Sequence, residues 1–210
     1  MGSRMGMERT LALGACLAAC LMATGCDGGD GGESRPSGLT VSMTAAPPPP
    51  GQDVVWMDEG GRTGDLLLVD ILARDIGQAF DAFEIEISFD RLRLQARSSA
   101  EGGALDACTG LPILHSDNIG NGGAAATGKL LVSGVSTEPP GTTNCTVPGT
   151  RVLARVTFAA IAEGSSDLDF VPFDNDPMDP RGSRLFGTGE GLPVAAVSFF
   201  DSQATVTGSR

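Results

Sequence analysis

Alternating apolar and polar positions are the strongest signal in this chain. In residues 81–90, Phe83, Ile85, Ile87 and Phe89 alternate with polar side chains, which is the period of a strand with one face in a core and one in water. Residues 65–76 are more continuously apolar, as expected of a strand that is covered on both faces or lies centrally in a sheet. Both segments therefore predict β-structure.

Shorter segments of the same kind continue to the end of the chain. They combine β-branched or aromatic residues with Gly, Pro, Asn or Asp at their ends and cover residues 39–44, 92–97, 129–136, 151–162, 168–173 and 194–207. After the first 25 residues no stretch carries apolar side chains at helical spacing, and 30 glycines and 13 prolines would break most helices. We therefore predict an all-β domain, a two-sheet β-sandwich or jelly roll of about nine strands.

The first 25 residues have the composition of a leader that is absent from the mature protein. Arg4 and Arg9 give a weakly positive start, and residues 11–22 form an unbroken run of Leu, Ala, Gly, Cys and Met. This run is too short for a transmembrane helix, which needs roughly 20 apolar residues. We therefore expect a signal peptide over residues 1–25 and an exported protein.

Cys26 follows small residues at the predicted cleavage site, and the polar, glycine-rich residues 27–33 come directly after it. This arrangement resembles the lipobox of bacterial lipoproteins, in which a cysteine is acylated and becomes the mature N-terminus. Cys20 is the alternative, because the residues before it match the lipobox better letter by letter; a further alternative is an ordinary secretory leader with an incidental cysteine. The resemblance implies a lipid anchor at the cell envelope, on its periplasmic or surface face. Composition then predicts a flexible Gly/Asp tether over residues 26–38 and a folded domain over residues 39–210.

The charge balance excludes nucleic acid as a partner. The chain has a formal net charge of −12, with 14 basic and 26 acidic residues and a single lysine. A phosphate backbone is held by clustered Lys and Arg side chains, which this sequence does not supply. For the same reason we expect membrane association only through the N-terminal lipid.

Cys108 and Cys145 are the two cysteines of the predicted domain. Because an exported domain folds in an oxidising compartment, we expect them to form a disulfide, and two unrelated free thiols are the alternative. Both lie in Gly-, Pro- and Thr-rich segments, so a bridge would join two long loops. On the loop-entropy model such a bridge contributes about 4 kcal/mol.

Three segments carry a resemblance to a known family. Residues 64–71 look like an opening Gly-Asp with a long strand, residues 83–90 like an F-x-I-x-hydrophobic-S-Y-D strand with Phe89 in place of Tyr, and residues 153–158 like a LatitF strand. In this order they resemble the cohesin-like domains of the carbohydrate-binding β-sandwich superfamily. The resemblance implies a β-sandwich that binds without catalysis, because cohesins bind dockerin modules of other proteins and relatives in the superfamily bind polysaccharide.

Few residues are available for catalysis. His115 is the only histidine, the chain has no tyrosine, and no Gly-x-Ser-x-Gly elbow is present to display a nucleophile. A Ser-His-Asp arrangement would have to use His115, which we interpret as a surface-loop histidine. We therefore expect a protein that is not an enzyme.

One polar cluster offers metal ligands. Asp174, Asn175, Asp176 and Asp179 lie on one predicted turn and carry the oxygen ligands that Ca²⁺ takes. Met178 stands where a further ligand would be needed, and the glycine and distant glutamate of an EF-hand are missing. The two interpretations are a structural calcium site, which is the one candidate cofactor, and a solvated Asx-rich turn.

Two predicted loops, residues 45–64 and 98–128, are longer than such a domain needs. Unusually long loops are either functional or disordered. The first contains the only tryptophan, Trp56, with residues 54–57 as a candidate short strand. A flat aromatic on a sandwich surface stacks on sugars or anchors a protein interface, so Trp56 is the candidate ligand contact. Ordinary packing of the ring onto the sandwich is the alternative.

These features together predict a lipid-anchored module of the cell envelope that binds a protein or carbohydrate partner without catalysis. One alternative is a structural envelope lipoprotein without a separable ligand. Another is an unrecognised hydrolase, in which His115 would carry the activity.

Overall fold

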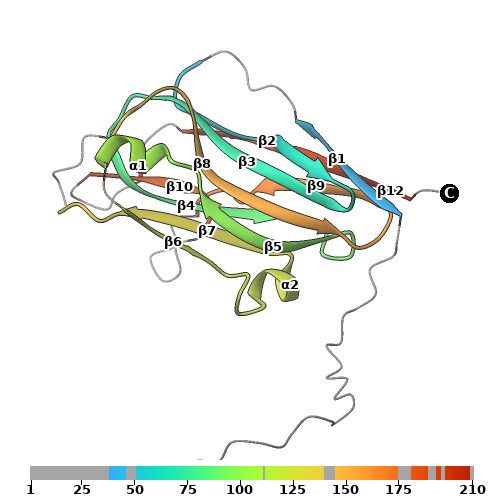
Figure 1. Ribbon diagram of the computed structural model, residues 1–210. Coiled ribbons are helices and arrows are strands. Elements are labelled where there is room, and N and C mark those ends of the chain that lie inside the picture. Colours follow the sequence, from blue (N-terminus) through green and yellow to red (C-terminus); the bar gives the residue numbers. More distant parts are fainter. Residues whose placement is uncertain are drawn as a thin grey trace, which may run out of the picture. The chain divides into compact units, whose positions relative to one another are not determined.

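Two β-sheets stack on each other and enclose the core, as Figure 1 shows. The computed structural model describes residues 38–45, 51–110, 112–139, 145–174, 181–188, 193–194 and 197–208. All of them belong to the unit Ser34–Arg210, and the unit Met1–Glu33 lies outside the described residues. The predicted signal peptide and both candidate acylation sites, Cys26 and Cys20, therefore lie outside them as well.

The smaller sheet has five strands within the described residues. Its order is β11 (Ser198–Phe200), β2 (Val54–Thr63), β3 (Leu66–Ile76), β8 (Val147–Ala160) and β5 (Leu94–Glu101). β11 runs parallel to β2, and the other neighbours are antiparallel. The apolar strand β3 lies at the centre of this sheet, as its sequence predicted.

The larger sheet has seven strands in the described part of the chain. Its main path is β1 (Leu39–Ala45), β12 (Ser202–Gly208), β9 (Gly164–Phe170), β4 (Phe80–Ser88), β7 (Lys129–Ser136) and β6 (Ile113–Asp117). The short strand β10 (Arg184–Gly187) also pairs with β4, on the edge that β9 uses further along.

The edge of β4 that faces β9 and β10 therefore changes partner partway along its length. β10 pairs with β4 up to Glu84, and β9 pairs with Ile87 and Ser88. On its other edge β4 pairs with β7 without interruption from Ala82 to Ser88. The change of partner leaves a seam beside Glu86, and this seam helps to shape the site described below.

The core lies between the sheets and is built from alternate residues of the strands. Alternate side chains of β3 and β4 are at most 1% exposed: Leu67, Val69, Ile71, Phe83, Ile85 and Ile87. Phe89 meets Phe158 of β8 edge to face, with the ring centroids 5.3 Å apart. Burial of apolar surface contributes roughly 25 cal/mol per Å² to stability. The alternation in the sequence is thus the alternation of core and solvent, and the predicted all-β sandwich is confirmed.

The prediction of a long loop over residues 45–64 was wrong in its second half, because β2 begins with the candidate short strand 54–57 and continues to Thr63. Residues 46–50 lie outside the described residues. The strand continues past Gly60 and Gly61, and glycines weaken the strand signal in a sequence. A Cβ on Gly60 would lie 2.7 Å from the carboxylate of Asp70 on β3. Glycine is therefore present at position 60 because the neighbouring carboxylate packs against the backbone there.

The prediction of a long loop over residues 98–128 was wrong as well. β5 extends to Glu101, and β6 lies between two short helices, α1 (Ala104–Thr109) and α2 (Gly123–Thr127). The helices have six and five residues, too few to show a helical period in the sequence. Across the described ranges, no helix has both the length and the apolar character needed to cross a membrane.

Candidate functional site

The solvent side of β6, β7, β4 and β10 is called the outer face from here on. The register of these antiparallel strands sets side chains in rows across it. One row is apolar and contains Leu114 of β6, Val135 of β7, Ala82 of β4 and Phe186 of β10. Leu114 is 67% exposed and its direct neighbour Val135 is 44% exposed. Single exposed apolar side chains are ordinary on a protein surface, whereas contiguous apolar patches mark contact surfaces, so this row is the candidate contact surface of the outer face.

The next row across the outer face is polar. The hydroxyl groups of Ser116 and Ser133 lie 2.8 Å apart. Arg184 of β10 donates from Nη2 to Oε1 of Glu84 on β4, at 3.1 Å, and its guanidinium lies 4.6 Å from the ring centroid of Phe186. This arginine therefore links the polar row to the apolar one.

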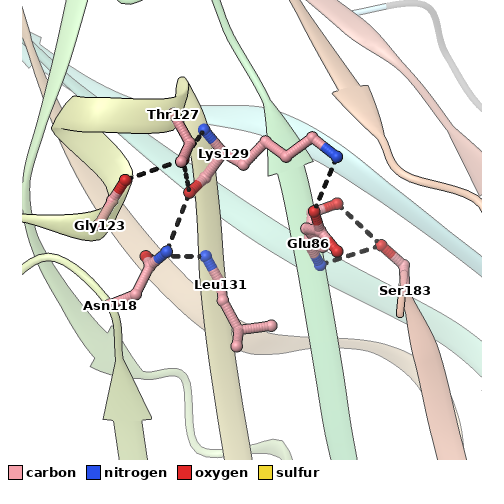
Figure 2. Close-up of polar contacts among 7 residues, drawn as sticks. All are labelled: Glu86, Asn118, Gly123, Thr127, Lys129, Leu131 and Ser183. Carbon is pink, nitrogen blue, oxygen red and sulfur yellow. Dashed lines mark hydrogen bonds and ion pairs between the residues drawn. The ribbon is translucent and has the colours of Figure 1, made fainter. Parts of the chain in front are cut away.

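A hollow of about 340 Å³ opens on the outer face beyond these rows, and Figure 2 shows several of its lining residues. Its lining residues are Glu84, Glu86, Asn118, Thr127, Lys129, Leu131 and Arg181. Lys129, the single lysine of the chain, reaches from β7 to β4, where its Nζ lies 3.3 Å from Oε1 of Glu86. Such a partly exposed ion pair adds little to stability. It does hold one cation and one carboxylate side by side in the hollow.

Ser183 fills the seam beside Glu86, as Figure 2 shows. Its hydroxyl accepts a hydrogen bond from the amide of Glu86 at 3.1 Å and donates one to the carbonyl of Glu86 at 3.0 Å. Neither β9 nor β10 has a ladder partner for Glu86, whose carbonyl also accepts a hydrogen bond from the amide of Val171, directly after β9, at 2.8 Å. The buried side chain of Ser183 supplies the hydrogen-bond acceptor for the amide of Glu86 that a neighbouring strand would otherwise supply. Ser183 therefore fixes the backbone that carries the Glu86 carboxylate.

Asn118 and Thr127 line the hollow, but their polar groups are used within the protein. Asn118 donates from Nδ2 to the carbonyl of Lys129 and accepts from the amide of Leu131, both at 3.0 Å. The hydroxyl of Thr127 donates to the carbonyl of Gly123 at 2.8 Å. These bonds tie the connection between β6 and β7 to the start of β7, and thereby hold the backbone of Lys129 (Figure 2).

A second polar cluster joins the edges of the two sheets. The hydroxyl of Ser99 on β5 donates to Oδ2 of Asp117 on β6 and lies 2.7 Å from Nε2 of His115 on the same strand. We call this three-residue cluster the clasp. The prediction that His115 lies in a surface loop was wrong, because the residue belongs to β6 and is half-buried.

The direction of the hydrogen bonds in the clasp does not fit a nucleophilic serine. Ser99 has one hydroxyl proton, and this proton points to Asp117. Nε2 of His115 must then donate to the serine oxygen, an assignment that follows from the bonding pattern. A histidine in that role cannot accept the serine proton, as a general base would.

Nδ1 of His115 and Oε1 of Glu101 are buried and have no hydrogen-bond partner among the described residues.

Two carboxyl groups of the larger sheet have shifted pKa values. For Asp117, burial raises the pKa, but hydrogen bonds from Ser99 and from the amides of Ile119 and Gly120, with the charge of His115, outweigh it, and the net pKa is lowered.

For Asp169 on β9, burial and the charges of Asp201 and Asp167 all raise the pKa. Asp169 pairs with Ser88, which places it on the outer side of the sheet. These three aspartates have no ion pair within the described residues. The β9 side of the sheet therefore carries negative charge that no cation of the described chain balances.

Trp56, the predicted ligand contact, lies in β2 between Leu72 of β3 and Phe200 of β11. Only 7% of it is exposed, and the guanidinium of Arg74 lies 5.5 Å from its ring centroid. The ring has little surface to offer a ligand. This position fits the alternative interpretation, packing onto the sandwich.

The predicted disulfide and calcium site are only partly within the described residues. Cys145 is buried, with Sγ 3.9 Å from the carbonyl oxygen of Ala104 at the start of α1, whereas the side chain of Cys108 in α1 lies outside the described set. The pairing of the two cysteines stays a prediction.

Of the four predicted calcium ligands, Asp174 is described, and its backbone pairs with Arg181. The other three, Asn175, Asp176 and Asp179, lie outside the described residues. Within those that the structure describes, no three His, Cys, Asp or Glu side chains are arranged to hold a metal. The calcium site stays a prediction.

The residues of the outer face were not predicted from the sequence, although one signal for them was present. In β7, Leu130 and Val132 face the core, so Leu131 and Val135 occupy solvent positions of the same strand. Apolar residues at positions where polar ones are expected indicate a contact surface. Ser183 left no such signal, because nothing in the local sequence relates it to Glu86.

No family model and no curated protein matches this chain, but solved structures of cohesin modules do. One is the second type II cohesin module of the adaptor ScaA scaffoldin of Acetivibrio cellulolyticus, with 16% identity and a TM-score of 0.52 over 71% of this chain and 87% of that one. Another is a chain of a type II cohesin–X-dockerin complex from Acetivibrio cellulolyticus, an N-terminal interface mutant, with 15% identity and a TM-score of 0.50 over 70% and 92%. At these identities the likeness shows the fold alone, and that fold is cohesin-like, as predicted.

Proposed function

We propose that this cohesin-like domain is a non-catalytic module that binds another protein through the outer face. The observation that carries the proposal is the pair of exposed apolar neighbours, Leu114 and Val135, beside a hollow with charged walls. An apolar patch with a polar rim has the composition of a protein interface. The type II cohesin of similar fold was solved in a complex with a dockerin, which supports a protein partner for this chain.

Polysaccharide fits the outer face less well than protein does. Sugar rings stack on flat, exposed aromatic side chains, whereas the exposed members of the apolar row are aliphatic. Phe186 is half-buried with the Arg184 guanidinium over its ring, and Trp56 is buried in the other sheet. These positions favour a partner that contributes apolar side chains of its own.

The arrangement of the clasp supports a module without hydrolytic activity. Ser99 and His115 are the one serine and histidine pair that the described residues bring into hydrogen-bond contact. Because His115 donates to Ser99, it does not offer the proton-accepting nitrogen that a serine nucleophile needs. A structural role without a ligand would leave the exposed row on the outer face unexplained.

We further propose that the module is exported and held at the cell envelope by a lipid on Cys26, with Cys20 as the alternative. The support is the leader pattern and the polar run after Cys26. A flexible tether of residues 27–38 would let the domain move within about 20 Å of its anchor. Incorporation of radiolabelled palmitate tests the site, because it should be lost in Cys26→Ala and kept in Cys20→Ala. Equal incorporation in both variants would contradict the assignment.

Capture of partners from native extracts tests the binding proposal. The unit Ser34–Arg210 is immobilised and exposed to envelope and culture-supernatant proteins, and captured proteins are quantified by mass spectrometry. The doubly substituted variant Leu114→Asp, Val135→Asp should capture at least about tenfold less of a partner protein than the unmodified domain, because charges then replace an apolar contact.

Leu92→Asp is the matched control for this experiment. Leu92 is 68% exposed, nearly the same as Leu114, but lies in the turn before β5 and not on the outer face. Its variant should capture the same proteins as the unmodified domain. If the double variant also captures them unchanged, or if the domain binds only members of a glycan array, the proposal is wrong.

A further inference from the structure

The outer face ends at β6, which is an edge strand of only five residues. Its backbone pairs with β7, and no further strand of the described chain pairs with its other edge. Two of its side chains, Leu114 and Ser116, belong to the outer face. The alternating residues His115 and Asp117 point the other way, toward Ser99 of the smaller sheet. One short strand therefore carries part of the binding surface and part of the clasp.

A bulge in β5 is what turns Ser99 toward β6. Before the bulge, Ala96 faces the core and pairs with Phe158, but the register shifts between Ala96 and Ser98. After the shift Ser99 pairs with Val156, a buried residue of β8. A regular strand would have continued the inward positions from Ala96 to Ser98. Bulges are known to re-aim side chains in this way.

Two hydrogen bonds of the clasp meet at the hydroxyl of Ser99. Nε2 of His115 donates to the serine oxygen. The Asp117 carboxylate accepts a hydrogen bond from the Ser99 hydroxyl, and its lowered pKa means that it stays ionised well into the acid range. The hydroxyl of Ser99 is thus bonded to two residues of β6 at once.

We propose that Ser99 is a positioning residue for binding: from the opposite sheet, it holds edge strand β6 in the place where Leu114 and Ser116 complete the outer face. Ser99 does so without contacting the partner, since its side chain lies between the sheets. This inference rests on the proposed function of the outer face. It adds that the smaller sheet, which carries no part of that face, contributes to affinity.

Hydrogen exchange of the backbone amides tests whether Ser99 holds β6. In Ser99→Ala, the amides of β6 should exchange about tenfold faster, because two side-chain bonds to a weakly held edge are lost. Amides of β1 and β12, at the far edge of the same sheet, should be unchanged. Ser98→Ala is the matched control, because the neighbouring serine is exposed and faces the other way. Ser99→Thr keeps the hydroxyl and should restore slow exchange.

Capture from the same native extracts tests whether this position matters for binding. Ser99→Ala should capture several-fold less of any protein that depends on Leu114 and Val135, and Ser99→Thr and Ser98→Ala should capture it normally. Unchanged exchange in β6, or failure of Ser99→Thr to restore it, overturns the inference. If the Leu114→Asp, Val135→Asp variant loses the partner while Ser99→Ala keeps it, the inference fails and the proposed function stands. If no captured protein depends on the outer face, the proposed function itself has failed.

Discussion

Asp117 on β6 and Asp169 on β9 lie on different strands of one sheet, and the pKa values of their carboxyl groups are shifted in opposite directions. The pKa of Asp117 is lowered and that of Asp169 is raised. Burial acts on both in the same direction, so it cannot explain the difference. Asp117 accepts hydrogen bonds from Ser99 and from backbone amides, whereas Asp169 faces two other carboxylates. The neighbours of a partly buried acid therefore decide the sign of its shift.

The same contrast separates two uses of charge on this sheet. At the β6 edge the carboxylate is bonded within the protein and helps to keep a short strand in place. On the β9 side, negative charge is left unbalanced within the described residues and weakens the fold slightly. The first arrangement supports the proposed binding face, and the second is a cost that substitution can remove.

The largest effect is expected from overpacking β7, the strand that pairs with β6. Gly134 of β7 lies opposite Phe83, and a Cβ there would lie 2.5 Å from Cε1 of the phenylalanine ring. Gly134→Ala should therefore lower the free energy of unfolding by about 1–3 kcal/mol through overpacking. Urea denaturation measures this loss.

Gly61→Ala on β2 is the control for Gly134→Ala, since nothing lies within 4 Å of its added Cβ. It should change the unfolding free energy far less. Carboxyl titration by NMR should also show the pKa of Asp117 returning toward its ordinary value in Gly134→Ala, with Asp169 unaffected. An equal loss of stability in both glycine variants would show that the contact with Phe83 is not the cause.

A smaller effect is expected from removing the charge of Asp117. Because its pKa is lower in the folded protein, its carboxylate stabilises the fold above the unfolded pKa, and this contribution is lost as the pH falls through the folded pKa. Asp117→Asn should therefore flatten the acid limb of the stability profile between about pH 5 and pH 2. Thermal unfolding across that range measures it. An acid limb as steep as that of the unmodified protein would contradict the role given to Ser99 and the two amides.

The smallest effect, with the opposite sign, is expected at Asp169. Its raised pKa means that the folded protein binds the proton more tightly, so stability declines as the pH rises from the ordinary value of 3.8 through the raised one. At neutral pH, Asp169→Asn should raise the melting temperature slightly, because repulsion from Asp201 and Asp167 is relieved. Calorimetry at pH 7 and at low pH provides the test. A variant less stable than the parent at neutral pH would show that Asp169 has a bonding partner that stabilises it.

Much of the architecture was predictable, because strand periodicity is a local property. Phe83, Ile85 and Ile87 marked β4 in the sequence, and residues 129–136 were predicted with the bounds that β7 has. The strand β2 was mostly missed, since glycines interrupt its pattern. The binding face was not predicted either, because the position of Val135 beside Leu114 depends on how β6 and β7 pair.

What the sequence determined by itself was the division between core and solvent along each strand, because alternate side chains must point to opposite faces of a sheet. What only the tertiary structure decided was the chemistry between strands. Ser99 meets His115 from 16 positions away after a bulge reverses its direction, and Ser183 completes the edge of Glu86 from 97 positions away. Hydrogen bonds over such separations follow from how the strands pair and the sheets pack, and no local pattern records them.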